Sequence, residues 1–121
     1  MGEQPSLRAS YRETPFEYWL SRGEDVLAVF ETTTEPKCRF ALHIENKLAT
    51  GNFTQLQPEL YAARAAAWSG KPKYQNYESW ETVLVAPRSF YERFRNDASK
   101  FNRFIAHEEL ADFIDEFGTQ T

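Results

Sequence analysis

The first half of the chain contains two short apolar segments joined by a polar turn, and this pattern constrains the fold most. Asp25–Glu31 (DVLAVFE) is rich in valine and aromatic residues, and Arg39–Lys47 (RFALHIENK) is apolar in its middle and polar at its end. Thr32–Lys37, between them, is polar and contains Pro36, as expected of a hairpin connection. The sequence therefore predicts an antiparallel hairpin, which commits this region to a β-sheet.

Three further segments extend the predicted sheet. Pro15–Ser21 (PFEYWLS) has a high aromatic content that favours a strand over a short helix. Glu81–Ala86 (ETVLVA) is typical of a buried strand and is stopped by Pro87. Arg103–Ala106 (RFIA) is predicted to be a short final strand. The strands are thus distributed along the whole chain.

One strong helix is predicted directly after the hairpin. Thr54 is the expected N-cap, and Gln57 three residues later completes a capping box. Pro58 falls in the first turn, where its missing N–H is tolerated. The alanine-rich run from Leu60 to Trp68 favours helix, and Gly70 is expected to end it.

Two shorter helices, over Ser89–Arg95 and Glu108–Phe117, complete the prediction. Three opening strands followed by alternating helices and strands predict an α/β fold with a mixed β-sheet flanked by helices. The length of 121 residues and the lack of an internal linker favour a single domain over residues 1–121. The polar ends, Met1–Ser10 and Gly118–Thr121, are expected to fray.

Composition excludes several classes of protein. The single cysteine, Cys38, rules out an intrachain disulfide, and no Cys/His spacing suits zinc. No apolar run approaches the roughly 18 residues of a membrane span, so we expect no membrane partner and a cytoplasmic location. A formal net charge of −4 counts mildly against nucleic-acid binding. Carboxylates gathered around a cation would, however, carry such charge before the metal binds.

The polar end of the hairpin concentrates chemically capable side chains. Because alternate residues of a strand share a face, His43, Glu45 and Lys47 lie together. Antiparallel pairing brings Asp25, at the start of the neighbouring strand, beside them. Two carboxylates with the backbone carbonyl of Asn46 suit Mg²⁺, and a lysine can stabilise a negative transition state. These groups together predict phosphodiester hydrolysis.

The same residues resemble the PD-(D/E)XK nuclease superfamily. The matching features are Asp25, the Glu45-Asn46-Lys47 triplet, and Gln57 with Tyr61 in a Q-x-x-x-Y pattern on the following helix. The later T-V-L-V-A-P and F-I-A-H-E-E-L stretches also fit, so the resemblance covers roughly residues 24 to 114.

The resemblance implies a restriction-endonuclease-like core and a nuclease that cleaves DNA in a defence or repair setting. It implies catalytic roles for the five residues Asp25, Glu45, Lys47, Gln57 and Tyr61. It also implies a Mg²⁺ or Mn²⁺ ion held by Asp25, Glu45 and Asn46.

The chain departs from the family pattern at its start. Such nucleases usually open with a helix that often supplies a further glutamate, and only about a dozen residues are present here before the first predicted strand. Glu13 and Glu17 are the substitutes that the sequence offers, although neither sits in a convincing helical pattern. This departure bears on activity more than on the fold.

Each feature also has a simpler structural interpretation. Asp25, Glu45 and Lys47 could form a surface salt bridge across a hairpin. Gln57 could be only a capping residue, and Tyr61 only a core residue. His43 is more often structural in such a position, and His107, before a helix, is expected to be a cap or surface residue.

Basic residues could form either a rim for a nucleic-acid backbone or a solvated face: Lys71, Lys73, Arg88, Arg93 and Arg95. The same choice, phosphate contact or ordinary exposure, applies to Arg64. The competing function is a catalytically inactive nucleic-acid-binding or assembly module of the same fold. The sequence leaves open DNA against RNA as substrate, and monomer against homodimer.

Overall fold

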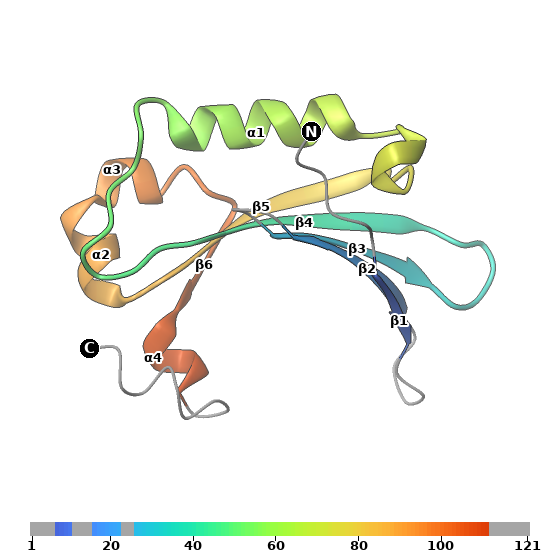
Figure 1. The fold of residues 1–121 in the computed structure, drawn as a ribbon, viewed down its shortest axis with the longest axis horizontal. Helices are drawn as coiled ribbons and strands as arrows, with labels where there is room; N and C mark the ends of the chain where they lie inside the picture. The colour runs from blue at the N-terminus through green and yellow to red at the C-terminus, as the bar shows by residue number, and fades with distance from the viewer. Residues whose placement is uncertain (1–6, 11–15, 23–25, 112–121) are drawn as a thin grey trace.

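The computed structural model describes residues 7–10, 16–22 and 26–111, and these form one sheet with helices around it (Figure 1). The strands are β1 (Leu7–Ser10), β2 (Phe16–Arg22), β3 (Val26–Thr32), β4 (Arg39–Asn46), β5 (Ser79–Ala86) and β6 (Arg103–Ala106). The helices are α1 (Gln57–Trp68), α2 (Arg88–Arg93), α3 (Arg95–Ala98) and α4 (His107–Leu110), with a 3₁₀ turn, η1 (Pro72–Tyr74).

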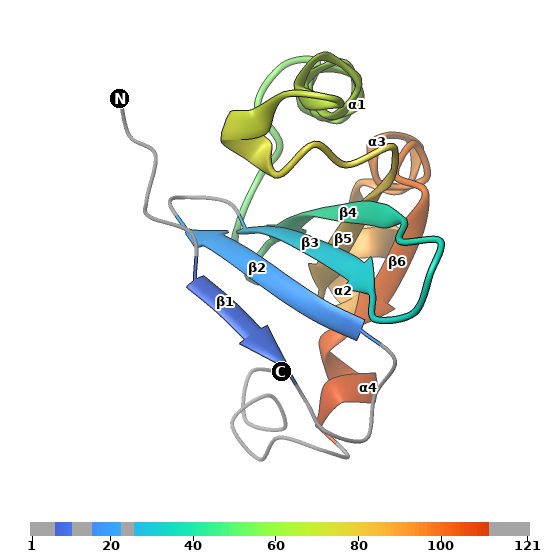
Figure 2. The same ribbon diagram turned by 90° about the vertical axis from the view of Figure 1, so that its right-hand side faces the viewer.

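The six strands lie in chain order, from β1 at one edge to β6 at the other (Figure 2). Strands β1 to β4 form an antiparallel meander, whereas β5 is parallel to β4 and β6 is parallel to β5. A parallel pair requires a crossover, which α1 supplies between β4 and β5 and the α2–α3 segment supplies between β5 and β6. The predicted α/β class with a mixed sheet is therefore confirmed.

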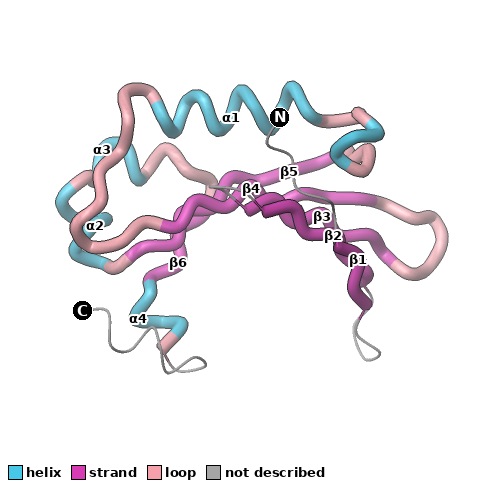
Figure 3. The backbone as a smooth tube through the Cα atoms, in the orientation of Figure 1, coloured by secondary structure: helices cyan, strands magenta, loops and turns pink. Residues whose placement is uncertain are grey.

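The sheet is arched, and α1 lies across its convex side (Figures 1 and 3). Helix α4 lies on the other side, below the end of β6. Alternate residues of β4 face α1, and these include Ala41, His43 and Glu45, all of which are buried. The layer between α1 and the sheet is thus where buried polar side chains meet the core.

Two aromatic clusters fill that layer. In the first, Tyr74 and Tyr77 pack on Leu27, Val29 and Ala41, and Trp68 at the end of α1 stacks on Tyr74 with ring centroids 3.9 Å apart. The second cluster lies nearer α2 and α3, and its buried members are Tyr61, Leu84, Ala86, Phe90, Ala98 and Phe101. The candidate site lies beside the second cluster, because Tyr61 belongs to both.

Most predicted elements are confirmed within a residue or two. Strand β6 has the predicted bounds, β2 and β3 are shifted by one residue, and β5 begins two residues earlier than Glu81. The expectation that Met1–Ser10 frays is wrong for Leu7–Ser10, which pairs with β2. The turn η1 and helix α3 were not predicted. Helix α4 begins at His107, and the predicted continuation beyond residue 111 lies outside the described residues.

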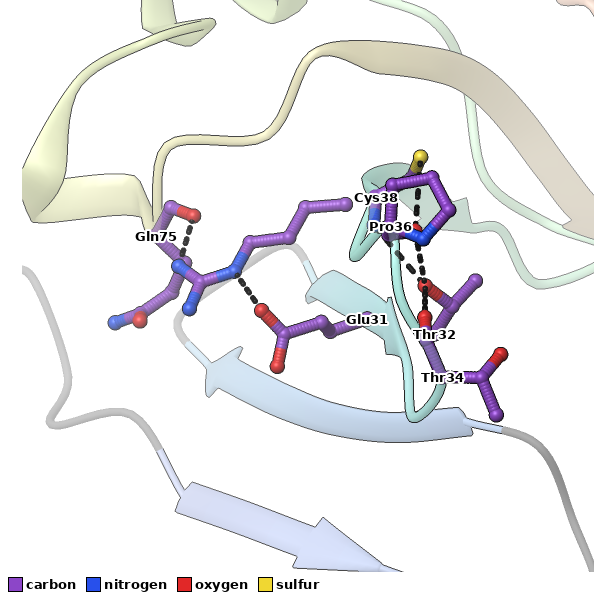
Figure 4. Close-up of polar contacts among 7 residues, drawn as sticks. Glu31, Thr32, Thr34, Pro36, Cys38 and Gln75 are labelled. Carbon is purple, nitrogen blue, oxygen red and sulfur yellow. Dashed lines mark hydrogen bonds and ion pairs between the residues drawn. The ribbon is translucent and has the colours of Figure 1, made fainter.

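The hairpin between β3 and β4 is held by its own polar contacts (Figure 4). Thr32 closes the loop, since its hydroxyl accepts the Cys38 N–H at 3.0 Å and its own N–H donates to the Cys38 carbonyl. Arg39 donates to the Glu31 carboxylate at 2.8 Å and to the Gln75 carbonyl at 2.6 Å. The second contact ties the start of β4 to the turn after η1, so the hairpin and the crossover are joined at this end.

Candidate active site at the end of strand β4

The Glu45 carboxylate is the centre of a polar cluster at the C-terminal end of β4. It is buried beneath α1, where the Tyr61 hydroxyl donates a hydrogen bond to Oε1. The Lys47 ammonium lies 3.3 Å from Oε2. The strand alternation places Glu45 and Lys47 on one face, and the first turns of α1 carry Tyr61 over them. A carboxylate, an amine and a phenol from two elements are therefore brought together.

Lys47 is positioned by the loop that follows β4. Its backbone N–H continues the parallel pairing by donating to the Val85 carbonyl at 2.9 Å. Its side chain folds back so that Nζ donates to the Asn52 carbonyl at 2.7 Å and lies 5.4 Å from the centre of the Phe53 ring. The side chain is only 14% exposed, so its position is defined by these groups and by Glu45.

Asp25, the other predicted carboxylate, lies outside the described residues. Strand β3 is described from Val26, which directly follows Asp25 in the sequence. Val26 pairs with Ile44, the residue before Glu45. The start of β3 therefore adjoins the Glu45 end of β4, which is the strand arrangement that the hairpin predicts.

Gln57 is the predicted site residue that the structure does not bring to the cluster. Its side-chain oxygen accepts the backbone N–H of Thr54 at 3.0 Å, which is a capping contact. Thr54 itself is not the N-cap, because α1 begins at Gln57 with Leu56 in the left-handed conformation (φ 60°). A helix begun at Thr54 would need an N–H from Pro58 for its first internal hydrogen bond, and proline has none. The later start keeps Pro58 in the first turn.

Asn46 points its side chain to the opposite face of the sheet from Glu45. Its Oδ1 accepts a hydrogen bond from His107 Nε2 at 2.8 Å. His107 is buried at the start of α4, so its assignment as a cap or surface residue is wrong. Burial lowers the pKa of His107, and the nearby Glu108 charge opposes this only partly. The backbone of Asn46, a predicted ligand, is thus anchored from the far side.

His43 takes part in a structural network. Tyr77 donates its hydroxyl hydrogen to the Ala65 carbonyl, so the His43 Nε2, 2.9 Å from the same oxygen, must be the donor. Burial raises the pKa of Tyr77 to about 12. This network links the middle of β4 to α1 and supports the helix that carries Tyr61.

Arg64, on the same side of α1, lies with its guanidinium 4.4 Å from the Tyr61 ring centre and 5.0 Å from that of Trp68. It is half-buried against aromatic faces, so the alternative of ordinary full exposure does not apply to it.

The described residues supply part of the ligand set that a divalent cation needs. A carboxylate offers about four lone-pair sites, so contacts from Tyr61 and Lys47 on different oxygens are compatible with metal ligation by Glu45. Within residues 26–111 and the two described strands before them, no group of at least three His, Cys, Asp or Glu side chains is placed to hold a metal. The predicted ligand set needs Asp25 to reach the usual two carboxylates.

Comparisons with known proteins add no family to these observations: no family model, no curated protein and no solved structure matches the chain. Among the helices of the described residues, none is long and apolar enough to cross a membrane.

Proposed function

We propose that the chain is a metal-dependent nuclease that hydrolyses phosphodiester bonds of DNA. The observation that carries this proposal is the meeting of Glu45, Lys47 and Tyr61 at the end of β4. The three residues come from the E-N-K triplet and the Q-x-x-x-Y helix, the two motifs that define the resemblance to PD-(D/E)XK nucleases. A strand and a helix that only formed a core would not need a buried acid, amine and phenol at one point.

The strand arrangement supports a restriction-endonuclease-like core. Strands β2, β3 and β4 form an antiparallel meander, α1 crosses over, and β5 runs parallel to β4. Among the described residues, the motif residues lie at the end of β4 and on α1, and Asp25 directly precedes β3 in the sequence. Two strands, β1 and β2, directly precede β3 in the described part of the chain, and Glu17 belongs to β2, while Glu13 lies outside the described residues.

Each residue has a distinct role in the proposed reaction. A bound Mg²⁺ or Mn²⁺ would neutralise phosphate charge and lower the pKa of water. Glu45, with Asp25 and the Asn46 carbonyl, would hold that ion. Lys47 would stabilise the negative charge that develops on the phosphorus centre, because its ammonium is held in place by the Asn52 carbonyl and Glu45. Tyr61 would orient the Glu45 carboxylate through its hydrogen bond.

A second candidate, the catalytically inactive nucleic-acid-binding or assembly module, is favoured by one observation. Glu45 already meets a cation, the Lys47 ammonium, and a phenol donor. A buried acid neutralised in this way is stable without a metal. In such a module, the same cluster would be a structural ion pair.

The deciding experiment combines metal binding with cleavage. Titration calorimetry with Mn²⁺ and nicking of plasmid and single-stranded DNA are run on the same preparation. The nuclease proposal predicts saturable Mn²⁺ binding and cleavage that stops in EDTA. A chain that melts cooperatively, binds no Mn²⁺ and cuts neither substrate would favour the binding module.

A further inference from the structure

Helix α2 holds the loop between β4 and α1 by hydrogen bonds, although the two segments are far apart in the sequence. Arg93, on α2, donates through one guanidinium nitrogen to the Ala49 carbonyl at 2.9 Å and to the Gly51 carbonyl at 2.7 Å. Both acceptors lie between Lys47 and Asn52, the residue whose carbonyl holds the Lys47 ammonium. We infer that Arg93 is a positioning residue for Lys47 and acts through this loop, an inference that rests on the proposed nuclease function.

Aromatic packing attaches the same loop to the α2–α3 segment. Phe53, at the end of the loop, packs against Phe90 and Phe94 with ring centroids 5.1 and 5.8 Å apart, and both partners belong to the α2–α3 segment. The Arg93 guanidinium itself lies 4.8 Å from the Phe94 ring centre. Arg93 and Phe53 therefore attach the loop to the same segment at two places, and Lys47 attaches to the loop between them.

The loop backbone is closely packed around Gly51. A Cβ added at Gly51 would lie 3.2 Å from the Leu48 carbonyl oxygen and 3.7 Å from Cδ of Lys47. The Gly51 backbone thus lies near the Lys47 side chain. A shift of the loop by about 1 Å would move the carbonyl that holds the ammonium, and misplacement on that scale can reduce a rate about 10²-fold.

A competing role for Arg93 is direct contact with a DNA phosphate. The two roles differ in what they change. Loss of a phosphate contact weakens substrate binding and reduces its salt dependence. Loss of a positioning contact lowers kcat while KM and its salt dependence stay the same, because substrate binding does not involve the residue.

The test compares Arg93→Met with Arg95→Met, a matched control that removes the same charge from the next exposed arginine, whose guanidinium lies over the Tyr91 ring and away from the carbonyls that Arg93 binds. Steady-state cleavage is measured at several salt concentrations, and amide hydrogen exchange follows residues 48–53. We expect Arg93→Met to lower kcat about 10- to 100-fold with unchanged KM and faster exchange in the loop. Arg93→Lys, which keeps a donor, should recover most of the rate, and Arg95→Met should resemble the wild type.

A raised KM with a weaker salt dependence in Arg93→Met would overturn the inference in favour of phosphate contact. An unchanged kcat per folded molecule would overturn it in favour of a structural role. Gly51→Ala gives a second check, since the added methyl would press on the Leu48 carbonyl and strain the loop while the Arg93 side chain is kept, and an unaltered kcat there would also count against the inference. If the wild type cuts no DNA, the proposed nuclease function fails, and the exchange data alone then decide whether Arg93 holds the Lys47 loop.

Discussion

An ion pair with a buried glutamate lies near each end of strand β4, and the two pairs are built differently. Glu31 and Glu45 are both 7% exposed. At the first end, Glu31 faces an arginine that also binds the Gln75 carbonyl, with short contacts throughout. At the second end, the lysine donates at 2.7 Å to a backbone carbonyl and lies farther, 3.3 Å, from Glu45.

This difference separates a structural pair from a candidate functional one. Arginine presents several donors in a fixed plane, which suits a permanent lock between elements. Lysine is a compact charge on a flexible chain, and a phenol is a neutral donor, so neither of these partners forms a planar two-point contact with Glu45 of the kind that arginine can form. We therefore expect the two ends of β4 to respond differently to substitution, one in stability and the other in cleavage.

The largest effect is expected for cleavage after loss of Glu45 or Lys47. Glu45→Ala and Lys47→Ala should each lower the cleavage rate at least about 10²-fold, the size of effect seen when one transition-state donor is removed. A high Mn²⁺ concentration should partly restore cleavage by Glu45→Ala, because this variant has lost a metal ligand. It should not restore cleavage by Lys47→Ala, because that variant has lost the positive charge that stabilises the transition state. Plasmid nicking across a Mn²⁺ series measures both.

Matched controls for these two changes lie in the exposed hairpin loop: Glu35→Ala and Lys37→Ala. Both should cleave at the wild-type rate. Equal losses in the loop variants, or equal Mn²⁺ rescue of both site variants, would contradict the assigned roles.

At the other end of β4, the expected loss is in stability. Arg39→Met leaves the buried Glu31 carboxylate without its cation, which should lower the free energy of unfolding by about 2–3 kcal/mol, less than for a fully buried pair because Arg39 is partly exposed. Urea unfolding measures the change. The double variant Glu31→Leu/Arg39→Met should regain most of it, since no charge is then left buried. The rate per folded molecule should not change, and a large rate loss would refute the structural assignment.

A smaller effect is expected from the phenol on Glu45. Tyr61→Phe removes one hydrogen bond to a charged group. The free energy of unfolding should therefore fall by about 1.5 kcal/mol, and the cleavage rate should fall about tenfold. Tyr77→Phe is the control, because it loses its bonds to His43 and Ala65 but touches no predicted catalytic residue. It should lower the melting temperature without slowing cleavage. Equal rate losses in the two variants would reduce Tyr61 to a core residue.

The smallest effect concerns pH and the far side of β4. Burial lowers the pKa of His107 in the folded state, so the unfolded chain takes up the proton first. The stability that neutral His107 contributes is present above its unfolded pKa of about 6.5 and is lost as pH falls through the lower folded value. Urea unfolding between pH 7.5 and 5 should therefore show a steeper loss in the wild type than in His107→Gln. Parallel curves would contradict this prediction.

The structural features that were correctly predicted from the sequence are those that depend on the pattern of neighbouring residues. The valine-rich segments and the turn at Pro36 indicated the hairpin, and the alternation of β4 placed Glu45 and Lys47 on one face. The helix spacing and the family pattern singled out Tyr61, which reaches Glu45, whereas the same reasoning paired it with Gln57, which is used in capping. The capping contact of Gln57 is the alternative role that the sequence also allowed, and local pattern alone could not decide between the two roles.

Contacts between distant segments could not be predicted. Arg93 and the loop at residues 49–51 are brought together only by the packing of α2, and nothing in either stretch indicates the other. The hydrogen bond between His107 and Asn46 likewise depends on where the end of β6 places α4. The short strand β1 was missed because four residues of mixed character carry no periodic signal, and its pairing with β2 determines its conformation.

The pairing of Lys47 with Val85 has a consequence for the order of folding. The meander of β2, β3 and β4 joins neighbours in the chain and can form early, because short loops are closed at little entropic cost. The lysine backbone, however, has its partner on β5, beyond the whole of α1. Glu45 likewise pairs with Leu84 on β5, so we expect both residues of the proposed site to be held only in the last steps of folding, when the crossover closes.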